Sequence, residues 1–365
     1  MNLRICWLVI LMTSKPQFAG EKVKLSDLCS KGKSSLRQKD LLNDGPYLVY
    51  GASGVIGTMS CYQNEEPYVA VVKDGAGVGR VMACKGKSSV LGTMQALLPS
   101  KNVDLNYLLH LVRSLKLGDD FSGSTIPHIY FRDYGEREVP AIAIKQQIMI
   151  AGVLDKIEMM LARLDMTLKK QDQLVKSRFV EMFGDPTKNQ KSWEFGTVES
   201  LSINLDSRRV PITQADRVPG PYPYYGASGI VDYVADFIFE EPLLLISEDG
   251  ANLLARTLPI AFSICGKTWV NNHAHILKCH NEAGRIYLET LINMLDISSY
   301  VTGSAQPKLN QKQLNSIPIM LPPLELQQEF ADFVAQVDKS GFAVRQQIEK
   351  LQLLYDSLAQ EHFGD

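Results

Sequence analysis

The segment Asp44-Gly45-Pro46-Tyr47-Leu48-Val49-Tyr50-Gly51-Ala52-Ser53-Gly54 returns as Pro219-Gly220-Pro221-Tyr222-Pro223-Tyr224-Tyr225-Gly226-Ala227-Ser228-Gly229. These copies are 175 positions apart (229 − 54), and Asp74-Gly75-Ala76 returns at the same distance as Asp249-Gly250-Ala251. Farther along, Ser122-Gly123-Ser124 returns as Thr302-Gly303-Ser304, 180 positions later (303 − 123). A period near half the chain predicts two copies of one globular unit, because solenoid repeats are only about 20–50 residues long.

Length and composition are those of a chain that can bury two cores. Its 365 residues are 45% hydrophobic and carry a net charge of −2. This length predicts about two domains, and the hydrophobic content argues against global disorder. The charge neither requires nor excludes nucleic acid as a partner.

The cysteines and the N-terminal stretch bear on localisation. The six cysteines form no Cys-x-x-Cys pair and lie at Cys6, Cys29, Cys61, Cys84, Cys265 and Cys279. We therefore expect reduced thiols and a cytoplasmic protein. The run from Arg4 to Met12 has features of a signal peptide, but we interpret residues 1–20 as an N-terminal extension outside the repeat. No other run approaches the roughly 20 apolar residues of a membrane span, so no membrane association is expected.

Each copy begins with short segments rich in aromatic and β-branched residues. Residues 47–50, 68–72 and 243–247 are predicted strands, the last two followed by Asp-Gly turns, and helices are expected over 107–117 and 287–295. We predict an α+β fold with two similar heads, each built on a mainly antiparallel sheet and followed by a long helix. The predicted boundaries are 21–139 for the first head, 140–185 for a central spacer helix, 186–321 for the second head and 322–365 for a C-terminal spacer helix.

A long apolar seam follows each head. Alternating 4-3 spacing connects Ile157, Leu161, Leu164, Leu168, Gln171, Val175, Arg178 and Met182. Adding 180 gives Val337, Gly341, Val344, Ile348, Leu351, Tyr355, Leu358 and His362. Heptad spacing over three to four heptads is typical of coiled coils, so we expect these helices to pair antiparallel with pseudo-two-fold symmetry. A helix that only covered its own head would show a wider apolar stripe.

Two motifs resemble catalytic or metal sites. Gly51-Ala52-Ser53-Gly54-Val55-Ile56-Gly57 has the glycine spacing of a dinucleotide fingerprint and suggests a nicotinamide-dependent oxidoreductase as an alternative. The residues up to Pro67 do not have the pattern of the helix that such a site needs. His273, His275, Cys279 and His280 have zinc-ligand chemistry, but we place Gln95 and Leu97 at the matching positions of the first head. We expect no metal and no catalytic residue in this chain.

The polar residues at the repeated turns differ between the copies. Arg and Lys suit guanine and phosphate, whereas Asn and Gln suit adenine. The candidate DNA contacts of the first head are Tyr50, Ser53, Lys73, Arg80, Lys85, Lys87, Ser124 and His128. Those of the second head are Tyr225, Ser228, Asn252, Arg256, Asn271, Asn272, Ser304, Gln306 and Lys308.

The chain resembles the specificity (S) subunits of type I restriction–modification systems. The resemblance rests on Tyr-Gly-Ala-Ser-Gly, on the segments 91–97 and 269–277, and on Gly-Ser-x-x-Pro. In both copies a proline and paired glutamines (Gln146-Gln147, Gln327-Gln328) then open the long helix. These motifs occur in order over about residues 21–365, although Pro140-Ala141-Ile142 departs from the expected Pro-Pro-Leu.

The resemblance implies a non-catalytic subunit whose two heads are target-recognition domains, each recognising half of a bipartite site in double-stranded DNA. Its helices would dock two methyltransferase (M) subunits, and restriction (R) subunits would join the complex. S-adenosylmethionine, ATP and Mg would then be bound by the partners and not by this chain. A coiled-coil scaffold that does not bind DNA remains a further alternative.

Overall fold

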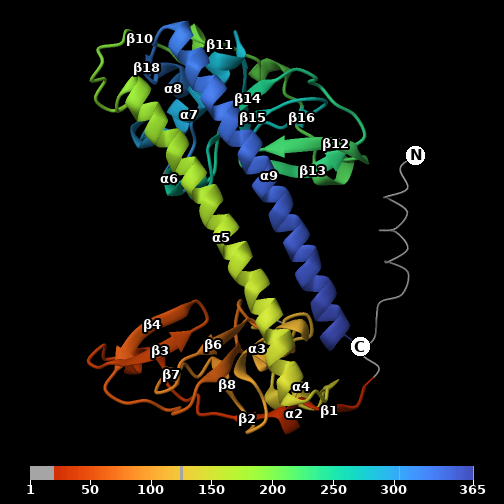
Figure 1. Cartoon of the computed structure of the whole chain (residues 1–365). Helices are drawn as coiled ribbons and strands as arrows, with labels where there is room; N and C mark the ends of the chain where they lie inside the picture. The colour runs from red at the N-terminus through yellow and green to blue at the C-terminus, as the bar shows by residue number, and fades with distance from the viewer. Residues whose placement is uncertain (1–19, 124–125, 304, 365) are drawn as a thin grey trace. The chain divides into compact units, whose positions relative to one another are not determined.

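The computed structural model describes residues 20–123, 126–303 and 305–364 (Figure 1). They form two compact units, and each is described by itself. Unit 1 contains residues up to Asp165 together with those from Gln346 onward, and unit 2 runs from Met166 to Arg345. Each unit therefore contains one head and part of both long helices. Among the described residues, no helix has the length and apolar character needed to cross a membrane.

Unit 1 is built on a four-stranded antiparallel sheet in the order β2-β8-β5-β6. Its strands are β2 (Cys29–Lys31), β5 (Tyr68–Val72), β6 (Val81–Cys84) and β8 (Met94–Pro99). A smaller sheet in the order β4-β3-β7 contains β3 (Tyr47–Gly51), β4 (Gly54–Met59) and β7 (Ser89–Val90). A two-stranded ribbon pairs β1 (Lys22–Lys24) with β9 (Glu138–Pro140). The helices of the head are α2 (Leu25–Leu28), α3 (Leu105–Ser114) and α4 (Phe131–Tyr134).

Unit 2 has the same topology. Its four-stranded sheet has the order β11-β17-β14-β15, with β11 (Ser202–Asn204), β14 (Leu243–Ser247), β15 (Ala261–Ile264) and β17 (Ala274–Cys279). Its smaller sheet has the order β13-β12-β16, with β12 (Pro219–Gly226), β13 (Gly229–Val234) and β16 (Trp269–Val270). The ribbon pairs β10 (Phe195–Gly196) with β18 (Ile319–Met320), and the helices are α6 (Asn252–Ala255), α7 (Glu282–Met294) and α8 (Gln311–Ser316). The predicted α+β class and the predicted duplication are confirmed.

The central strand of each head is buried on both faces. In β5, Val69 and Val71 point into a core shared with α3, whereas Ala70 and Val72 point into a core beneath the smaller sheet. In β14, Leu244 and Ile246 point into one core and Leu243 and Leu245 into the other, in the same alternating way. This burial explains why both strands are continuous apolar runs, since side chains alternate between the faces of a strand.

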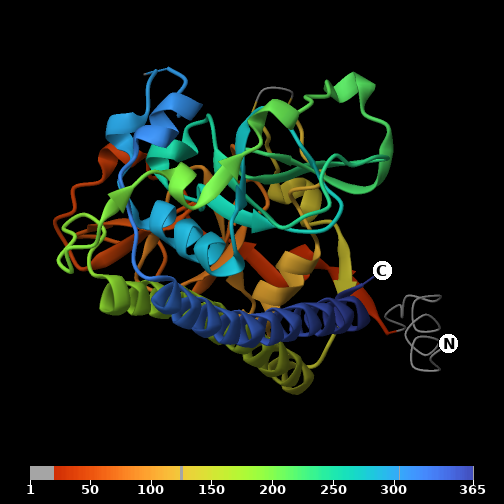
Figure 2. The same ribbon diagram turned by 90° about the horizontal axis from the view of Figure 1, so that it is seen from above.

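The long helices α5 (Ile144–Phe183) and α9 (Leu324–Phe363) contain 40 residues each. In unit 1 the start of α5 shares a core with the end of α9, and in unit 2 the end of α5 shares one with the start of α9. The helices are therefore antiparallel within each unit, and Figure 2 shows them side by side. In unit 2, Gln171 on α5 donates a hydrogen bond to Ser340 on α9 (3.0 Å), and Arg178 donates to Glu329 (2.7 Å).

The shielded positions of both helices follow the predicted seam. All sixteen residues of the 4-3 pattern are buried or half-buried, whereas most of their neighbours in the middle of the helices are exposed. Gly341 is one of them, and a Cβ there would lie 3.2 Å from Oε1 of Gln171. The glycine therefore permits a close approach of the two helices at this point.

An aromatic cluster anchors both long helices to unit 2. Phe179 and Phe183 on α5, Phe330 on α9 and Tyr287 on α7 are each fully shielded, with ring centroids 4.9–5.5 Å apart. Tyr287 also donates a hydrogen bond to the carbonyl of Met320 (2.9 Å). Three of these ring pairs pack edge to face, which adds to the large apolar burial of the rings.

The substitution Phe330→Ala should lower the free energy of unfolding of unit 2 by about 3–5 kcal/mol, because it leaves a cavity among the rings. Phe342→Ala on the same helix is the matched control, since Phe342 is 60% exposed, and it should change that free energy by less than about 0.5 kcal/mol. Urea unfolding followed by tryptophan fluorescence measures the difference, because Trp193 packs against this core. Equal effects of the two substitutions would contradict the assigned packing.

Candidate nucleic-acid interface

Four segments meet at one edge of the large sheet in unit 1. Three backbone hydrogen bonds of 2.9–3.0 Å join them: Lys73 N to Thr93 O, Gly75 N to Pro127 O, and Ile129 N to Lys73 O. The hairpin turn at Ala52 lies beside the same loop, because a Cβ on Gly77 would be 3.7 Å from that of Ala52. We call the segments 51–54, 73–80, 91–93 and 126–129, with the bridged Ser122, the loop edge of unit 1.

Unit 2 has the same three backbone hydrogen bonds, and we call this set of bonds the frame of the loop edge. The corresponding hydrogen bonds join Glu248 N to His273 O (2.9 Å), Gly250 N to Pro307 O (3.0 Å) and Leu309 N to Glu248 O (2.7 Å). The loop edge of unit 2 comprises segments 226–229, 248–260, 271–273 and 306–309, with the bridged Thr302. Gly75 and Gly250 have φ values of +92° and +106°, which favour glycine and explain the repeated Asp-Gly pair.

The two edges differ by an insertion in one loop. Val71 pairs with Val81 in unit 1, and Ile246 pairs with Ala261 in unit 2. Val71 and Ile246, which precede the loop, are 175 positions apart, whereas Val81 and Ala261, which follow it, are 180 positions apart. Unit 2 therefore has five additional residues in this loop. The insertion contains α6, and it explains the change in repeat distance found in the sequence. The counterpart of Arg80 is consequently Ile260, which is fully buried.

The candidate contacts of unit 1 fall into two places. Ser53 and Arg80 are exposed and line one cleft of about 550 Å³, and Lys73 is half-buried in the same loop as Arg80. His128 belongs to the frame, because its Nδ1 lies 2.6 Å from Oδ1 of Asp74. Lys85 and Lys87 are exposed but follow β6, whereas Arg80 precedes it, so they lie at the opposite end of that strand from the loop edge.

Tyr50 is not a surface residue, which corrects the sequence interpretation. It is 8% exposed and packs in the core beneath the smaller sheet. Its hydroxyl accepts a hydrogen bond from the amide of Lys85 (3.4 Å). The aromatic residue of the repeated motif is therefore a core residue in unit 1, and its counterpart Tyr225 is half-buried beside the equivalent core.

Three candidate residues of unit 2 stabilise loops instead of facing outward. Asn252 accepts hydrogen bonds from the amide of Leu258 and the hydroxyl of Thr257, both at 3.0 Å, which closes the inserted loop. Arg256 donates to the carbonyls of Ile292 and Leu295 at the end of α7, and burial lowers the pKa of its guanidinium. Asn271 is 6% exposed and accepts from the amide of His273 (2.8 Å). A sequence pattern cannot distinguish such loop bonds from DNA contacts.

Four candidates of unit 2 remain at the surface. Ser228, Asn272, Gln306 and Lys308 are exposed, and all lie on the loop edge. Lys308 forms an ion pair with Glu248 (3.2 Å). The remaining candidates, Ser124 and Ser304, lie outside the described residues.

A buried charge network that the sequence did not reveal supports the loop edge of unit 2. Arg209 forms ion pairs with Glu248 and with Asp206 (3.6 Å), and it donates to the carbonyl of Ala274 (2.9 Å). His275 contacts Asp206 through Nδ1 (2.6 Å) and the carbonyl of Leu309 through Nε2 (2.7 Å). These contacts connect β17 to the loop after β14 and to the segment that follows Pro307. Its members are far apart in the sequence, so no local motif indicates the network.

The charges in this network shift the pKa values of both carboxyl groups. Burial by itself would raise the pKa of Asp206, but the hydrogen bond from His275 and the nearby positive charges outweigh burial and lower it below 3.8. Burial is likewise outweighed at Glu248, where Arg209, His275 and Lys308 lower the pKa below 4.5. Both groups are therefore carboxylates at neutral pH, and they stabilise the fold above their ordinary pKa values.

The histidines and cysteines considered as zinc ligands are not brought together. His273 contacts Asp249 (2.7 Å), whereas His275 contacts Asp206. Strand pairing also corrects the alignment of the two heads: the counterparts of these histidines are Thr93 and Gln95, and not Gln95 and Leu97 as the sequence suggested. Burial raises the pKa of the Cys279 thiol to about 12, as it does for Cys29 and Cys84. These buried thiols are protonated at neutral pH and are poor nucleophiles or ligands.

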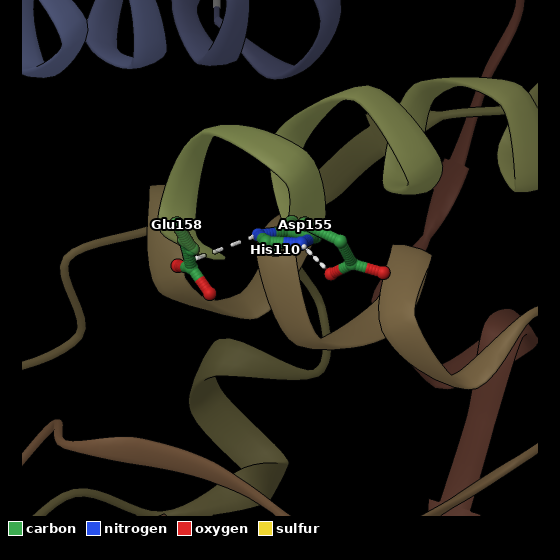
Figure 3. A group of neighbouring side chains, drawn as sticks. All are labelled: His110, Asp155 and Glu158. Atoms are coloured by element: carbon green, nitrogen blue, oxygen red, sulfur yellow. Dashed lines mark hydrogen bonds and ion pairs between the residues drawn. The ribbon is translucent and has the colours of Figure 1, made fainter. Parts of the chain in front are cut away.

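A second histidine–carboxylate group fastens α3 to the long helices of unit 1 (Figure 3). His110 on α3 lies 2.8 Å from Asp155 of α5 and 2.9 Å from the hydroxyl of Tyr355 on α9. Glu158 already accepts from Arg113 (2.6 Å), and Asp155 accepts from Asn106 (2.8 Å). The carboxylates thus have protein donors, and the group has the chemistry of a structural tie.

The glycine motif forms a hairpin and not a nucleotide site. Gly54 has a φ of +111° at the turn between β3 and β4, and the residues after it continue as strand β4 to Met59. A dinucleotide fingerprint requires a helix N-terminus there to bind the pyrophosphate.

Arg209→Met should lower the free energy of unfolding of unit 2 by about 3 kcal/mol at pH 7, because it leaves buried carboxylates without their main cation. Arg208→Met is the control, since that arginine pairs with Glu241 nearer the surface and should contribute at most about 1 kcal/mol. The folded-state pKa values are lowered, so this stabilisation is present above the ordinary values of 3.8 and 4.5 and is lost as pH falls through the lowered ones. The difference between the variants should therefore shrink below pH 3.8 in urea unfolding, and a constant difference would contradict the assignment.

Comparison with known proteins agrees with this architecture. The family model for the type I restriction modification DNA specificity domain matches residues 20–171 and 190–352. A putative type I restriction enzyme specificity subunit from Haemophilus influenzae is 32% identical over 136 residues. That match spans 37% of this chain and 35% of the relative, about a third of each.

Two solved structures share the fold over almost the whole chain. The S subunit of a type I restriction–modification system from M. genitalium matches with a TM-score of 0.62 at 17% identity, covering 97% of this chain and all of that one. A chain from a study of complex assembly and conformational transition of the type I R-M system matches with a TM-score of 0.50 at 13% identity, covering 94% and 97%. Because the family model matches most of its length, in two copies, the chain belongs to the type I restriction–modification DNA specificity family.

Proposed function

We propose that this chain recognises a split site in double-stranded DNA, one half with each loop edge. The observation that carries the proposal is the repeated frame: identical backbone hydrogen bonds present different side chains in the two units. A fixed frame with variable presented residues suits a protein whose two halves recognise different base sequences. Direct recognition of bases requires such side chains to enter a groove, where each base pair offers a distinct set of donors and acceptors.

The chain itself acts without catalysis in this proposal. Methyltransferase subunits would bind S-adenosylmethionine and methylate DNA, and restriction subunits would use ATP and Mg. Membership of a family defined by DNA specificity supports this division of labour. A cytoplasmic location follows from the DNA substrate and agrees with the free thiols of the described cysteines.

The test is to co-express the full chain with a methyltransferase subunit encoded beside it and to sequence the host DNA for methylated adenines. The expected result is a split motif with an unspecified gap, present only when both proteins are made. A stable complex that modifies no DNA would contradict the proposal, as would modification without sequence preference. If no complex forms and the chain has no sequence preference for DNA, the scaffold alternative gains support.

The start of α5 is the surface that we assign to methyltransferase docking. Six apolar side chains are 38–66% exposed there: Ile144, Ile148, Met149, Val153, Met159 and Met160. Four of their counterparts on α9 are polar, namely Gln328, Glu329, Lys339 and Ser340. The same fold thus tolerates polar residues at these positions, so packing inside the chain does not require the apolar ones. Several exposed apolar side chains close together on one helix are typical of a protein contact.

The double substitution Ile148→Glu with Met149→Glu should weaken binding of the methyltransferase subunit at least about tenfold, because each buried apolar side chain contributes about 1.5–3 kcal/mol. Lys156→Glu on the same helix gives the control for the change of charge. Affinity can be measured by titrating the labelled chain with the methyltransferase subunit. Unchanged affinity of the double variant would remove this surface from the proposal.

A further inference from the structure

The arginines of the two heads differ in how they are used. Unit 2 has five arginines between its long helices, and each is engaged inside the protein. Arg208, Arg209 and Arg217 form ion pairs with Glu241, Glu248 and Asp232, Arg256 donates to two carbonyls, and Arg285 contacts Glu282 and Ser263. These guanidinium groups hold the fold of unit 2 and are committed to partners within the chain.

Unit 1 also has five arginines in its head, and four of them are paired. Arg37, Arg113, Arg132 and Arg137 form ion pairs with Asp40, Glu158, Asp133 and Asp120. The side chain of Arg80 is the exception within the described residues: it is exposed and has no ion pair or hydrogen bond there. It lies where the loop after β5 ends, in the cleft that contains Ser53. The backbone of Arg80 is thus fixed by the loop, whereas its guanidinium group has no partner among the described residues.

Two of the free polar side chains at the loop edge of unit 2 are amides. Asn272 and Gln306 are exposed, and within the described part of the chain their side chains form no hydrogen bond. Their backbones are held: the carbonyl of Asn272 accepts from Arg209 (3.4 Å), and Pro307, next to Gln306, accepts from Gly250 (3.0 Å). The exposed cation nearby, Lys308, is paired with Glu248.

We propose that the two units recognise different base chemistry: Arg80 of unit 1 contacts a guanine, and Asn272 and Gln306 of unit 2 contact adenine. This inference rests on the proposed function. An arginine fork matches the two acceptors of guanine in the major groove, whereas an amide matches the adjacent donor and acceptor of adenine. The residues are chosen because they combine three properties: exposure, a backbone hydrogen bond at the residue or at its neighbour, and a side chain without a partner among the described residues.

The test uses the full chain in its complex with the co-expressed methyltransferase subunit, selected against a randomised DNA library. Arg80→Ala should reduce the preference for guanine at one position of one half-site by roughly 5- to 150-fold and leave the other half-site unchanged. Arg80→Lys keeps the charge but loses the fork, so it should retain overall affinity while losing most of that preference. Lys101→Ala is the control, because Lys101 is exposed beyond the far end of β8 and should leave both half-sites intact.

For unit 2, Asn272→Ala and Gln306→Ala should each relax an adenine position in the half-site that Arg80 does not affect, by a similar factor. His280→Ala gives the control, since His280 is exposed and follows β17 at the end opposite to Asn272. Circular dichroism of each variant checks that folding is retained.

The outcomes separate this inference from the proposed function. If the unaltered complex selects a split motif but Arg80→Ala only weakens binding to all sequences, Arg80 contacts phosphate and the inference is wrong while the function stands. The same conclusion follows if the amide variants leave the motif unchanged or if one variant alters both half-sites. If the unaltered complex selects no motif, the proposed function fails, and the inference fails with it.

Discussion

A hydrogen bond between the amide of an Asp-Gly glycine and the carbonyl of a proline that lies far along the chain holds each loop edge together. Gly75 donates to Pro127 and Gly250 donates to Pro307, both at 3.0 Å. The glycine adopts a positive φ, so the chain turns away from the central strand at once and its next residues lie beside the segment around the proline. Because both partners are backbone groups, side chains elsewhere on the edge can change without disturbing the frame.

This constraint explains which sequence features repeat and which do not. Glycines, prolines and core residues return in both copies because they fix backbone conformation or fill a core. The loop after the central strand can gain five residues and a short helix, because its two ends remain fixed by strand pairing. Loops on the surface of a rigid sheet accept such insertions readily. Side chains that face outward can therefore differ between the copies without changing the backbone frame.

The sequence could predict the elements whose cause is local. Strands 68–72 and 243–247 were predicted from their composition and the Asp-Gly turns that follow, and both are buried. The 4-3 spacing of the long helices matches their shielded positions. The role of individual polar residues could not be predicted, because it depends on distant partners. Tyr50 is a core residue, and Arg256 bonds to the end of α7. Arg209 pairs with Glu248, 39 residues farther along the chain, in a network with no local motif. A polar residue in a turn has the same appearance in a sequence whether it binds a carbonyl or faces solvent.

Whether a polar side chain has a hydrogen bond or ion pair within the chain therefore determines whether the residue can be substituted without loss of stability. Removing Arg209 leaves buried carboxylates unpaired, a cost that limits substitution there whatever the DNA sequence. Asn272, Gln306 and Arg80 are under no such limit, because their side chains form no hydrogen bond or ion pair within the described residues. Exposed positions of this kind change stability by only about 0.5 kcal/mol when substituted. In the proposed function, stability and recognition are thus separated residue by residue, and a change of DNA preference is compatible with an unchanged fold only at positions whose side chains form no hydrogen bond or ion pair within the chain.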